Sequence, residues 1–153
     1  MITVYRIGKK KYTHDPLGGS GGLIVGGRWH QKGARIVYSA QSLSLASLEF
    51  FVHFQRVHSA IELVSFDIKV PNSLIEVLPA TLLPKDWNAT PAVSATADIG
   101  NTWLVSARSA VLCVPSALTP GEFNYLINPA HADFGQIKVT ATTLFHYDSR
   151  LWK

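Results

Sequence analysis

The sequence predicts an α+β fold, with several short strands of mixed order around two main helices. Hydrophobic residues make up 47% of the 153-residue chain and charged residues 16%, so the chain can bury a core and is not expected to be disordered. Apolar and polar residues alternate in residues 2–7, 61–70 and 136–145, as in half-buried strands. Apolar residues recur at helical spacing in residues 42–53 and 90–106. A chain of this length is expected to form one domain.

The first strand is expected over residues 2–7. Ile2 and Val4 put Arg6 on the same face, because side chains alternate along a strand. An arginine on such an inward face either reaches solvent at the end of the strand or points its cation into a site. The three lysines at residues 9–11 then predict a solvated turn.

A glycine-rich segment follows, with six of the eleven glycines between Gly18 and Gly27. Its backbone can approach phosphates closely, and a flexible surface loop is an equal alternative. The segment is not a P-loop, because no Gly-Lys-Ser/Thr follows, and it does not match the dinucleotide-binding fingerprint. Arg28 leaves this loop, and Tyr38 ends a short apolar run that predicts a strand.

The next helix is expected to begin at Ser42 or Ser44, since serine is a good N-cap residue. Its apolar face is predicted from three residues at helical spacing, Leu45, Leu48 and Val52. Glu49 lies on or beside that face, where a carboxylate is costly unless it has partners or borders a cavity. It is therefore either a boundary residue that can pair with His53 one turn on, or part of a site.

Further strands are predicted over residues 61–70, 74–78, 110–114 and 136–145. In the first of these, one face is formed by Val64, Phe66, Ile68 and Val70. In the last, the inward residues are Ile137, Val139, Ala141, Thr143 and Phe145. A second helix is expected to start at Thr90–Pro91, with the proline near its first position, and to run to about Ser106. Trp103 is assigned to the core, and Gly100 weakens this helix prediction.

Composition narrows the classes of function. The net charge of +4 indicates an anionic partner, such as a nucleotide, a nucleic acid or an acidic protein. The only run of cations is residues 9–11, so the sequence argues only weakly for a nucleic-acid groove.

The single cysteine, Cys113, excludes an intrachain disulfide and fits a packing residue in a reducing cytoplasm. No segment reaches the roughly 18–20 apolar residues of a membrane span, and the first residues do not resemble a signal peptide. No spacing suggests a metal site, and the lone histidines His14, His58 and His146 are assigned to the surface.

Several motifs together resemble the RES domain family. They are Gly-Gly-Arg-Trp-His at residues 26–30, Val-Tyr-Ser at 37–39, Leu-Glu at 48–49, Val-Pro-Ser-Ala at 114–117 and Asn-Tyr-Leu-Ile-Asn-Pro at 124–129. The family is named for an Arg, a Glu and a Ser. Its members are toxins of bacterial toxin–antitoxin pairs that consume NAD, and their antitoxins are Xre-like DNA-binding proteins. The resemblance covers nearly the whole sequence, so residues 1–153 are expected to form a single RES domain.

The resemblance implies an ADP-ribosyltransferase-like fold, with two packed sheets, flanking helices and an NAD cleft between them. It also implies site residues. Glu49, Arg28 and Tyr38 are expected to be catalytic, Arg6 and Ser116 to bind NAD with Arg28 and Tyr38, and His30 and Asn124 to support them. In this assignment Arg28 suits the pyrophosphate, Tyr38 stacks on the nicotinamide, and Glu49 opposes the positive charge that develops on the ribose. Ser116 either hydrogen-bonds the ribose or fixes Glu49; without the resemblance it is an ordinary turn serine, and nothing supports a hydrolase triad.

Three functions remain open at this point. The first is an NAD-degrading toxin, by hydrolysis or phosphorolysis, and the second is an ADP-ribosyltransferase that modifies a protein at the same site. The third is a basic module that binds nucleic acid without chemistry. NAD is expected as the substrate, with no other cofactor and no metal. The resemblance implies an Xre-like antitoxin that covers the site and carries the DNA binding, and it allows a homodimer of this chain within the complex.

Overall fold

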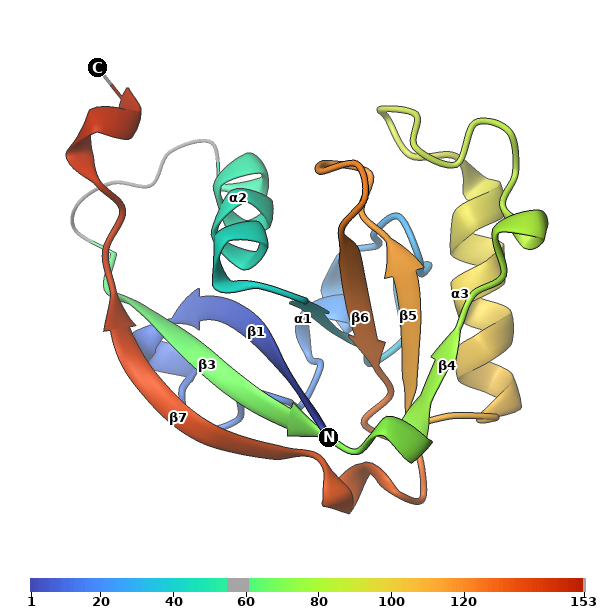
Figure 1. Ribbon diagram of the computed structural model, residues 1–153, viewed down its shortest axis with the longest axis horizontal. Coiled ribbons are helices and arrows are strands. Elements are labelled where there is room, and N and C mark those ends of the chain that lie inside the picture. Colours follow the sequence, from blue (N-terminus) through green and yellow to red (C-terminus); the bar gives the residue numbers. More distant parts are fainter. Residues whose placement is uncertain (55–60, 153) are drawn as a thin grey trace.

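In the computed structural model, which describes residues 1–54 and 61–152, seven strands form one sheet in the order β4-β5-β6-β2-β1-β3-β7 (Figure 1). The strands are β1 (Ile2–Lys9), β2 (Val37–Ala40), β3 (Leu63–Val70), β4 (Ile75–Val77), β5 (Val111–Pro115), β6 (Phe123–Ile127) and β7 (Lys138–Phe145). Neighbours are antiparallel except β4 and β5, which are parallel. The α-helices are α1 (Gly21–Ile24), α2 (Leu43–His53) and α3 (Ser94–Ser106), and short 3-10 turns occupy Lys10–Tyr12, Asn72–Leu74, Ala80–Leu82, Phe134–Gln136 and Ser149–Trp152. The predicted α+β class is confirmed.

The expectation of two separate sheets needs an adjustment at the junction of β1 and β2. These strands share a single register pair, Tyr5 with Ala40, whereas β1 and β3 share eight. All four residues of the short strand β2 pair with β6 on its other edge. The sheet therefore consists of a β1–β3–β7 half and a β4–β5–β6–β2 half that meet at this narrow junction, and Figure 1 shows them on opposite sides of it.

The helix α2 follows β2 directly and is capped as predicted. The Ser42 side chain accepts a hydrogen bond from the backbone N–H of Leu45 at 3.1 Å. The predicted apolar face is wrong for two residues, however, because Leu48 and Val52 are 46% and 48% exposed. The buried face is formed instead by Leu45 and Ala46, with Phe50 partly buried, packed on Ile7, Ala40 and Leu63.

The helix α3 begins at Ser94, so the predicted start at Thr90–Pro91 is wrong. Val93, the residue before the helix, has an extended backbone, which keeps the helix from starting earlier. Gly100 has a packing role, because a Cβ there would lie 1.6 Å from the Trp29 carbonyl oxygen. Trp103 is 1% exposed, which confirms its assignment to the core.

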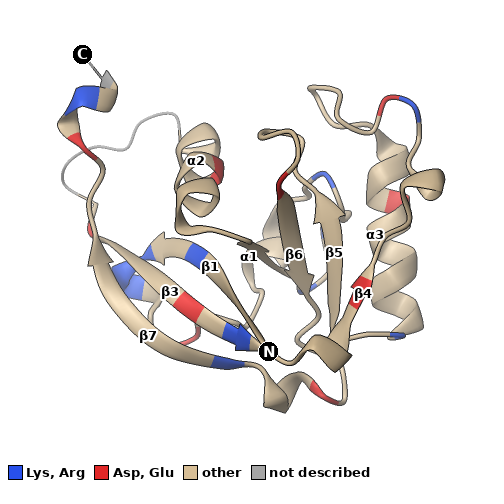
Figure 2. Cartoon of the chain, viewed as in Figure 1, with Lys and Arg blue, Asp and Glu red and all other residues tan. Residues whose placement is uncertain are grey.

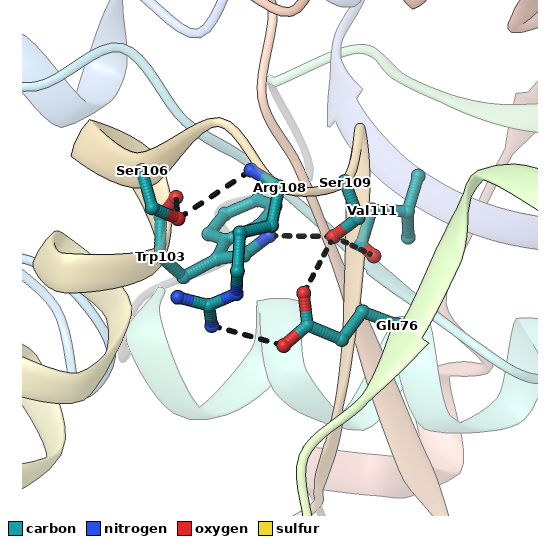
Figure 3. Close-up of polar contacts among 6 residues, drawn as sticks. All are labelled: Glu76, Trp103, Ser106, Arg108, Ser109 and Val111. Atoms are coloured by element: carbon teal, nitrogen blue, oxygen red, sulfur yellow. Dashed lines mark hydrogen bonds and ion pairs between the residues drawn. The ribbon is translucent and has the colours of Figure 1, made fainter.

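A polar network fastens the end of α3 to β4 (Figure 3). The Trp103 indole N–H donates to Ser109 Oγ at 2.8 Å, and Ser109 Oγ donates to Glu76 Oε2 at 3.2 Å. Arg108 donates to the other Glu76 oxygen at 2.9 Å. Because Arg108 is 53% exposed, that ion pair adds little stability, whereas the buried indole N–H requires its partner.

The remaining strand predictions are confirmed in place, with one correction. β4 lies within residues 74–78, β5 overlaps residues 110–114 and ends one residue later, and Cys113 is buried. In β7, Ala141 and Thr143 are exposed, so their predicted inward orientation is wrong. The strand lies at the edge of the sheet, and its pairing with β3 shifts register at Asp67/Ile68, which breaks the simple alternation. His14 and His146 are exposed as predicted, whereas His58 lies outside the described residues.

None of the described helices is both long and apolar enough to cross a membrane.

Candidate active site

Tyr38 is central to the candidate site, because both its hydroxyl group and its backbone carbonyl group bond to other parts of the chain. Its hydroxyl oxygen accepts the backbone N–H of Trp29 at 3.2 Å and lies 2.8 Å from Nδ1 of His30. Its carbonyl oxygen accepts a hydrogen bond from Nη1 of Arg6 at 3.0 Å. The strand β2 thus connects β1, through Arg6, to the loop that carries Arg28.

His30 determines where the Tyr38 proton points. The Nε2 atom of His30 lies 3.0 Å from the Val25 carbonyl, which can only accept, so Nε2 carries a proton. In the neutral ring Nδ1 is then an acceptor, and the Tyr38 hydroxyl donates to it. Burial raises the pKa of Tyr38 well above its usual value, an effect that the Trp29 N–H and Arg28 partly offset and the Glu49 carboxylate reinforces. Tyr38 therefore keeps its proton at neutral pH and directs it into the protein.

The glycine-rich loop packs tightly against these residues. A Cβ at Gly27 would lie 2.8 Å from the Tyr38 hydroxyl, and one at Gly22 would lie 2.3 Å from the Ala34 carbonyl oxygen. Gly27 also forms an isolated antiparallel bridge with His30. At these two positions close packing within the protein accounts for glycine, whether or not the loop also contacts a phosphate.

Arg28 ties this loop to the segment before α3. Its Nη1 atom donates to the carbonyl oxygens of Trp87 and Ala89 at 2.9 and 2.8 Å. Within the described residues these are the hydrogen bonds of the Arg28 guanidinium, so the edge formed by Nε and Nη2 keeps its paired donors for a ligand.

Neither Arg6 nor Arg28 forms an ion pair with a carboxylate of the residues that the structure describes. The ion pairs among residues 1–54 and 61–152 involve Lys10, Arg108, His131 and Arg150, and not Arg6 or Arg28. Both residues are partly buried, and burial lowers the pKa of Arg6. A guanidinium remains charged in proteins, so two partly desolvated cations near Tyr38 favour an anionic ligand.

Glu49 and Ser116 meet across two elements that lie side by side (Figure 1). The Ser116 hydroxyl, from the connection between β5 and β6, donates to Glu49 Oε1 on α2 at 3.4 Å. Ser116 Oγ in turn accepts the backbone N–H groups of Leu118 and Thr119 at 3.1 and 3.0 Å, which orients the hydroxyl proton toward Glu49. Ser116 is 3% exposed, an arrangement that fits the role of fixing Glu49 better than contact with a ribose. The alternative pairing of Glu49 with His53 does not occur among the described ion pairs.

The structure therefore joins several of the predicted site residues directly. Arg6 and His30 contact Tyr38, and Ser116 contacts Glu49. Asn124 is 8% exposed and donates to the Ser39 carbonyl at 3.4 Å, next to Tyr38 in β2. The carbonyl groups of Trp87 and Ala89 were missed, because a backbone oxygen leaves no signal in a sequence. Among the described residues, no three His, Cys, Asp or Glu side chains are grouped to hold a metal ion.

Comparisons with known proteins identify the family and the fold of this chain. The family model "RES domain" matches residues 3–148. A protein of Photorhabdus laumondii named "Toxin Res" is 38% identical over 99% of this chain and 98% of its own length. A protein of Sphingobium named "Prs ADP-ribosylating toxin" is 39% identical over 93% of this chain and 90% of its own. Among solved structures, a chain from the M. tuberculosis MbcT–MbcA toxin–antitoxin complex matches with a TM-score of 0.75, 19% identity and coverage of 94% of this chain and 84% of its own, which shows a shared fold.

Proposed function

The chain belongs to the RES domain family, and from this premise we propose that it is the toxin of a bacterial toxin–antitoxin pair and that it cleaves the bond between nicotinamide and ribose in NAD. The observation that carries the proposal is the group around Tyr38. Arg6 and Arg28, which have no carboxylate partners among the described residues, and Glu49 lie near the partly buried Tyr38. An NAD molecule presents an anionic pyrophosphate and a cationic pyridinium ring, so it complements both signs of charge.

The proposed chemistry assigns one task to each group. The Arg28 edge with Nε and Nη2 grips the pyrophosphate as a fork, and Arg6 adds a second cation. As the glycosidic bond breaks, its electron pair leaves with nicotinamide, which becomes neutral, and positive charge develops on the ribose. Glu49 opposes that charge. In hydrolysis a water oxygen bonds to the ribose carbon and loses its proton, giving ADP-ribose, nicotinamide and H⁺.

Tyr38 contributes its ring to this scheme, because its hydroxyl is engaged by Trp29 and His30. We expect Tyr38→Phe to lower NAD turnover by less than about threefold, although it loses roughly 1–3 kcal/mol of stability through unpaired buried groups. Tyr38→Leu removes the stacking surface and is expected to raise KM by about tenfold, since a cation–π contact contributes up to about 2 kcal/mol. Steady-state kinetics with thermal melts compare the two variants. A folded Tyr38→Phe protein that loses more than about a hundredfold in turnover, over 2.7 kcal/mol, would assign the hydroxyl to the chemistry instead.

The acceptor of the ADP-ribose defines a second candidate. Water, phosphate and a protein side chain all attack the same ribose carbon, so the same site serves each of them. The Sphingobium relative named "Prs ADP-ribosylating toxin" favours transfer to a protein. Incubation of the purified chain with radiolabelled NAD and cell extract separates transfer to a protein from degradation. Label attached to a protein band supports transfer, and label confined to small molecules supports degradation.

Expression of the chain alone tests the toxin assignment. We expect growth of a bacterial host to stop and its NAD to fall, whereas Glu49→Gln produced at the same level should do neither. Unchanged growth and NAD content in cells that hold soluble wild-type protein would count against the assignment.

We propose that an antitoxin covers the site. The structural neighbour was solved as a toxin–antitoxin complex, MbcT–MbcA. Apolar side chains are exposed on the two elements that meet at Glu49 and Ser116, namely Leu48 and Val52 on α2 and Leu118 and Phe123 near β6. Such side chains suit a protein partner. Co-expression with an Xre-like neighbour should restore growth and give a complex on a sizing column, and the complex rather than this chain should bind the operator. Absence of both effects would remove the partner.

A nucleic-acid module without chemistry remains the alternative of another class. Figure 2 shows Lys and Arg residues scattered over β1, β3, β7 and the connecting segments, interleaved with acidic residues. Such a distribution lacks the single basic stripe of a nucleic-acid groove. Sub-micromolar DNA or RNA binding with a steep dependence on salt would revive this alternative.

A further inference from the structure

The helix α2 is held from two sides. On one side Glu49 meets Ser116 of the β5–β6 connection. On the other, the Tyr147 hydroxyl, from the segment after β7, donates to the carbonyl oxygen of Ser47. Figure 1 shows α2 standing between the C-terminal segment and β6. Ser47 and Glu49 are two residues apart, about 200° around the helix axis, so the two contacts approach from nearly opposite directions.

Tyr147 is itself anchored to the sheet. Its ring packs edge-on against Phe145 with centroids 5.0 Å apart, and Phe145 pairs with Leu63 in β3. The same ring lies 5.6 Å from that of Phe51, one turn beyond Ser47. A carbonyl oxygen has two lone pairs, so the Tyr147 bond leaves the helical bond of Ser47 intact. Burial raises the pKa of Tyr147 to about 12, so its hydroxyl remains a donor at neutral pH.

We propose that Tyr147 is a positioning residue that fixes α2 so that Glu49 stays beside Ser116. The effect on turnover rests on the function proposed above, whereas the effect on α2 does not. The need for such a residue follows from the packing of α2, in which only Leu45 and Ala46 are buried and Leu48 and Val52 are exposed. Beyond its first turn α2 packs on the core through the partly buried Phe50, so contacts outside the core also set where its second and third turns lie. A shift of about 1 Å in a reacting group can lower a rate by about a hundredfold.

The test uses Tyr147→Ala and Tyr147→Phe, each alone and combined with Glu49→Gln. Tyr12→Ala is the matched control, because Tyr12 is 56% exposed. Hydrogen exchange of the α2 amides reports on the helix, and steady-state kinetics with NAD report on Glu49. We expect faster exchange in α2 for both Tyr147 variants, and for Tyr147→Ala a loss of roughly ten- to a hundredfold in kcat with KM within about twofold. Tyr147→Phe keeps the ring contacts and should fall between Tyr147→Ala and wild type.

The double variant separates positioning from general stability. If Tyr147 acts through Glu49, Tyr147→Ala should lower turnover by less than about twofold in the Glu49→Gln background, since coupled residues are not additive. Equal losses in both backgrounds, or unchanged exchange in α2 for both Tyr147 variants, would overturn the proposal. If wild-type protein does not cleave NAD, the proposed function fails while the exchange data still decide whether Tyr147 holds α2. Should Tyr147→Ala not fold, Tyr147→Phe gives the same comparison with a smaller expected loss.

Discussion

Glu49→Gln is expected to lower NAD turnover by about a hundredfold to a thousandfold, roughly 3–4 kcal/mol, while NAD binding stays largely intact. The substitution keeps the size of the side chain and its ability to accept from Ser116, but it removes the negative charge. That charge opposes a cation that develops only in the transition state, so its loss appears in kcat. Steady-state cleavage and thermal melts of both proteins give the comparison.

The control for this substitution is Glu62→Gln, which removes a charge from a side chain that is 70% exposed. Its turnover should match that of wild type, because surface substitutions usually change stability by less than about 0.5 kcal/mol. A folded Glu49→Gln protein with more than about a third of wild-type turnover would exclude a catalytic Glu49, since that loss is below 1 kcal/mol.

Arg28→Lys is expected to lower kcat/KM for NAD by roughly ten- to a hundredfold, mostly through KM. Hydrogen bonds to charged groups contribute about 1.5–3 kcal/mol, and lysine cannot reproduce the fork while also bonding the carbonyls of Trp87 and Ala89. The matched control is Arg35→Lys, since exposed Arg35 also donates to a backbone carbonyl, that of Gly18. Wild-type kinetics in Arg28→Lys would transfer the phosphate role to Arg6.

Local sequence patterns predicted those features that depend on neighbouring residues alone, such as a helix cap or the alternation of a strand. Ser42 caps α2 because a serine side chain can accept the N–H of the first turn. The alternation in residues 61–70 predicted the buried face of β3, and Trp103 lies in the core as expected. The site residues depended on the resemblance, because nothing in the spacing of Glu49 and Ser116 indicates that they meet.

Other features depend on contacts between distant segments. The buried face of α2 runs through Ala46 and Phe50 rather than Leu48, because the sheet beneath it offers Ile7, Ala40 and Leu63. Gly100 disfavours a helix locally, yet α3 passes so close to Trp29 that no side chain fits. The hydrogen bond from Tyr147 to Ser47 joins residues 100 positions apart, and no sequence pattern predicts it.

The central claim is that this chain breaks the nicotinamide–ribose bond of NAD. The most direct measurement is an incubation of purified wild-type protein with NAD, with and without phosphate, followed by identification of the products by mass. We expect free nicotinamide in both samples, with ADP-ribose where water is the acceptor or its phosphorylated form where phosphate is. NAD recovered intact from folded wild-type protein in both samples, and again after addition of cell extract as a source of protein acceptors, would exclude NAD cleavage by this chain.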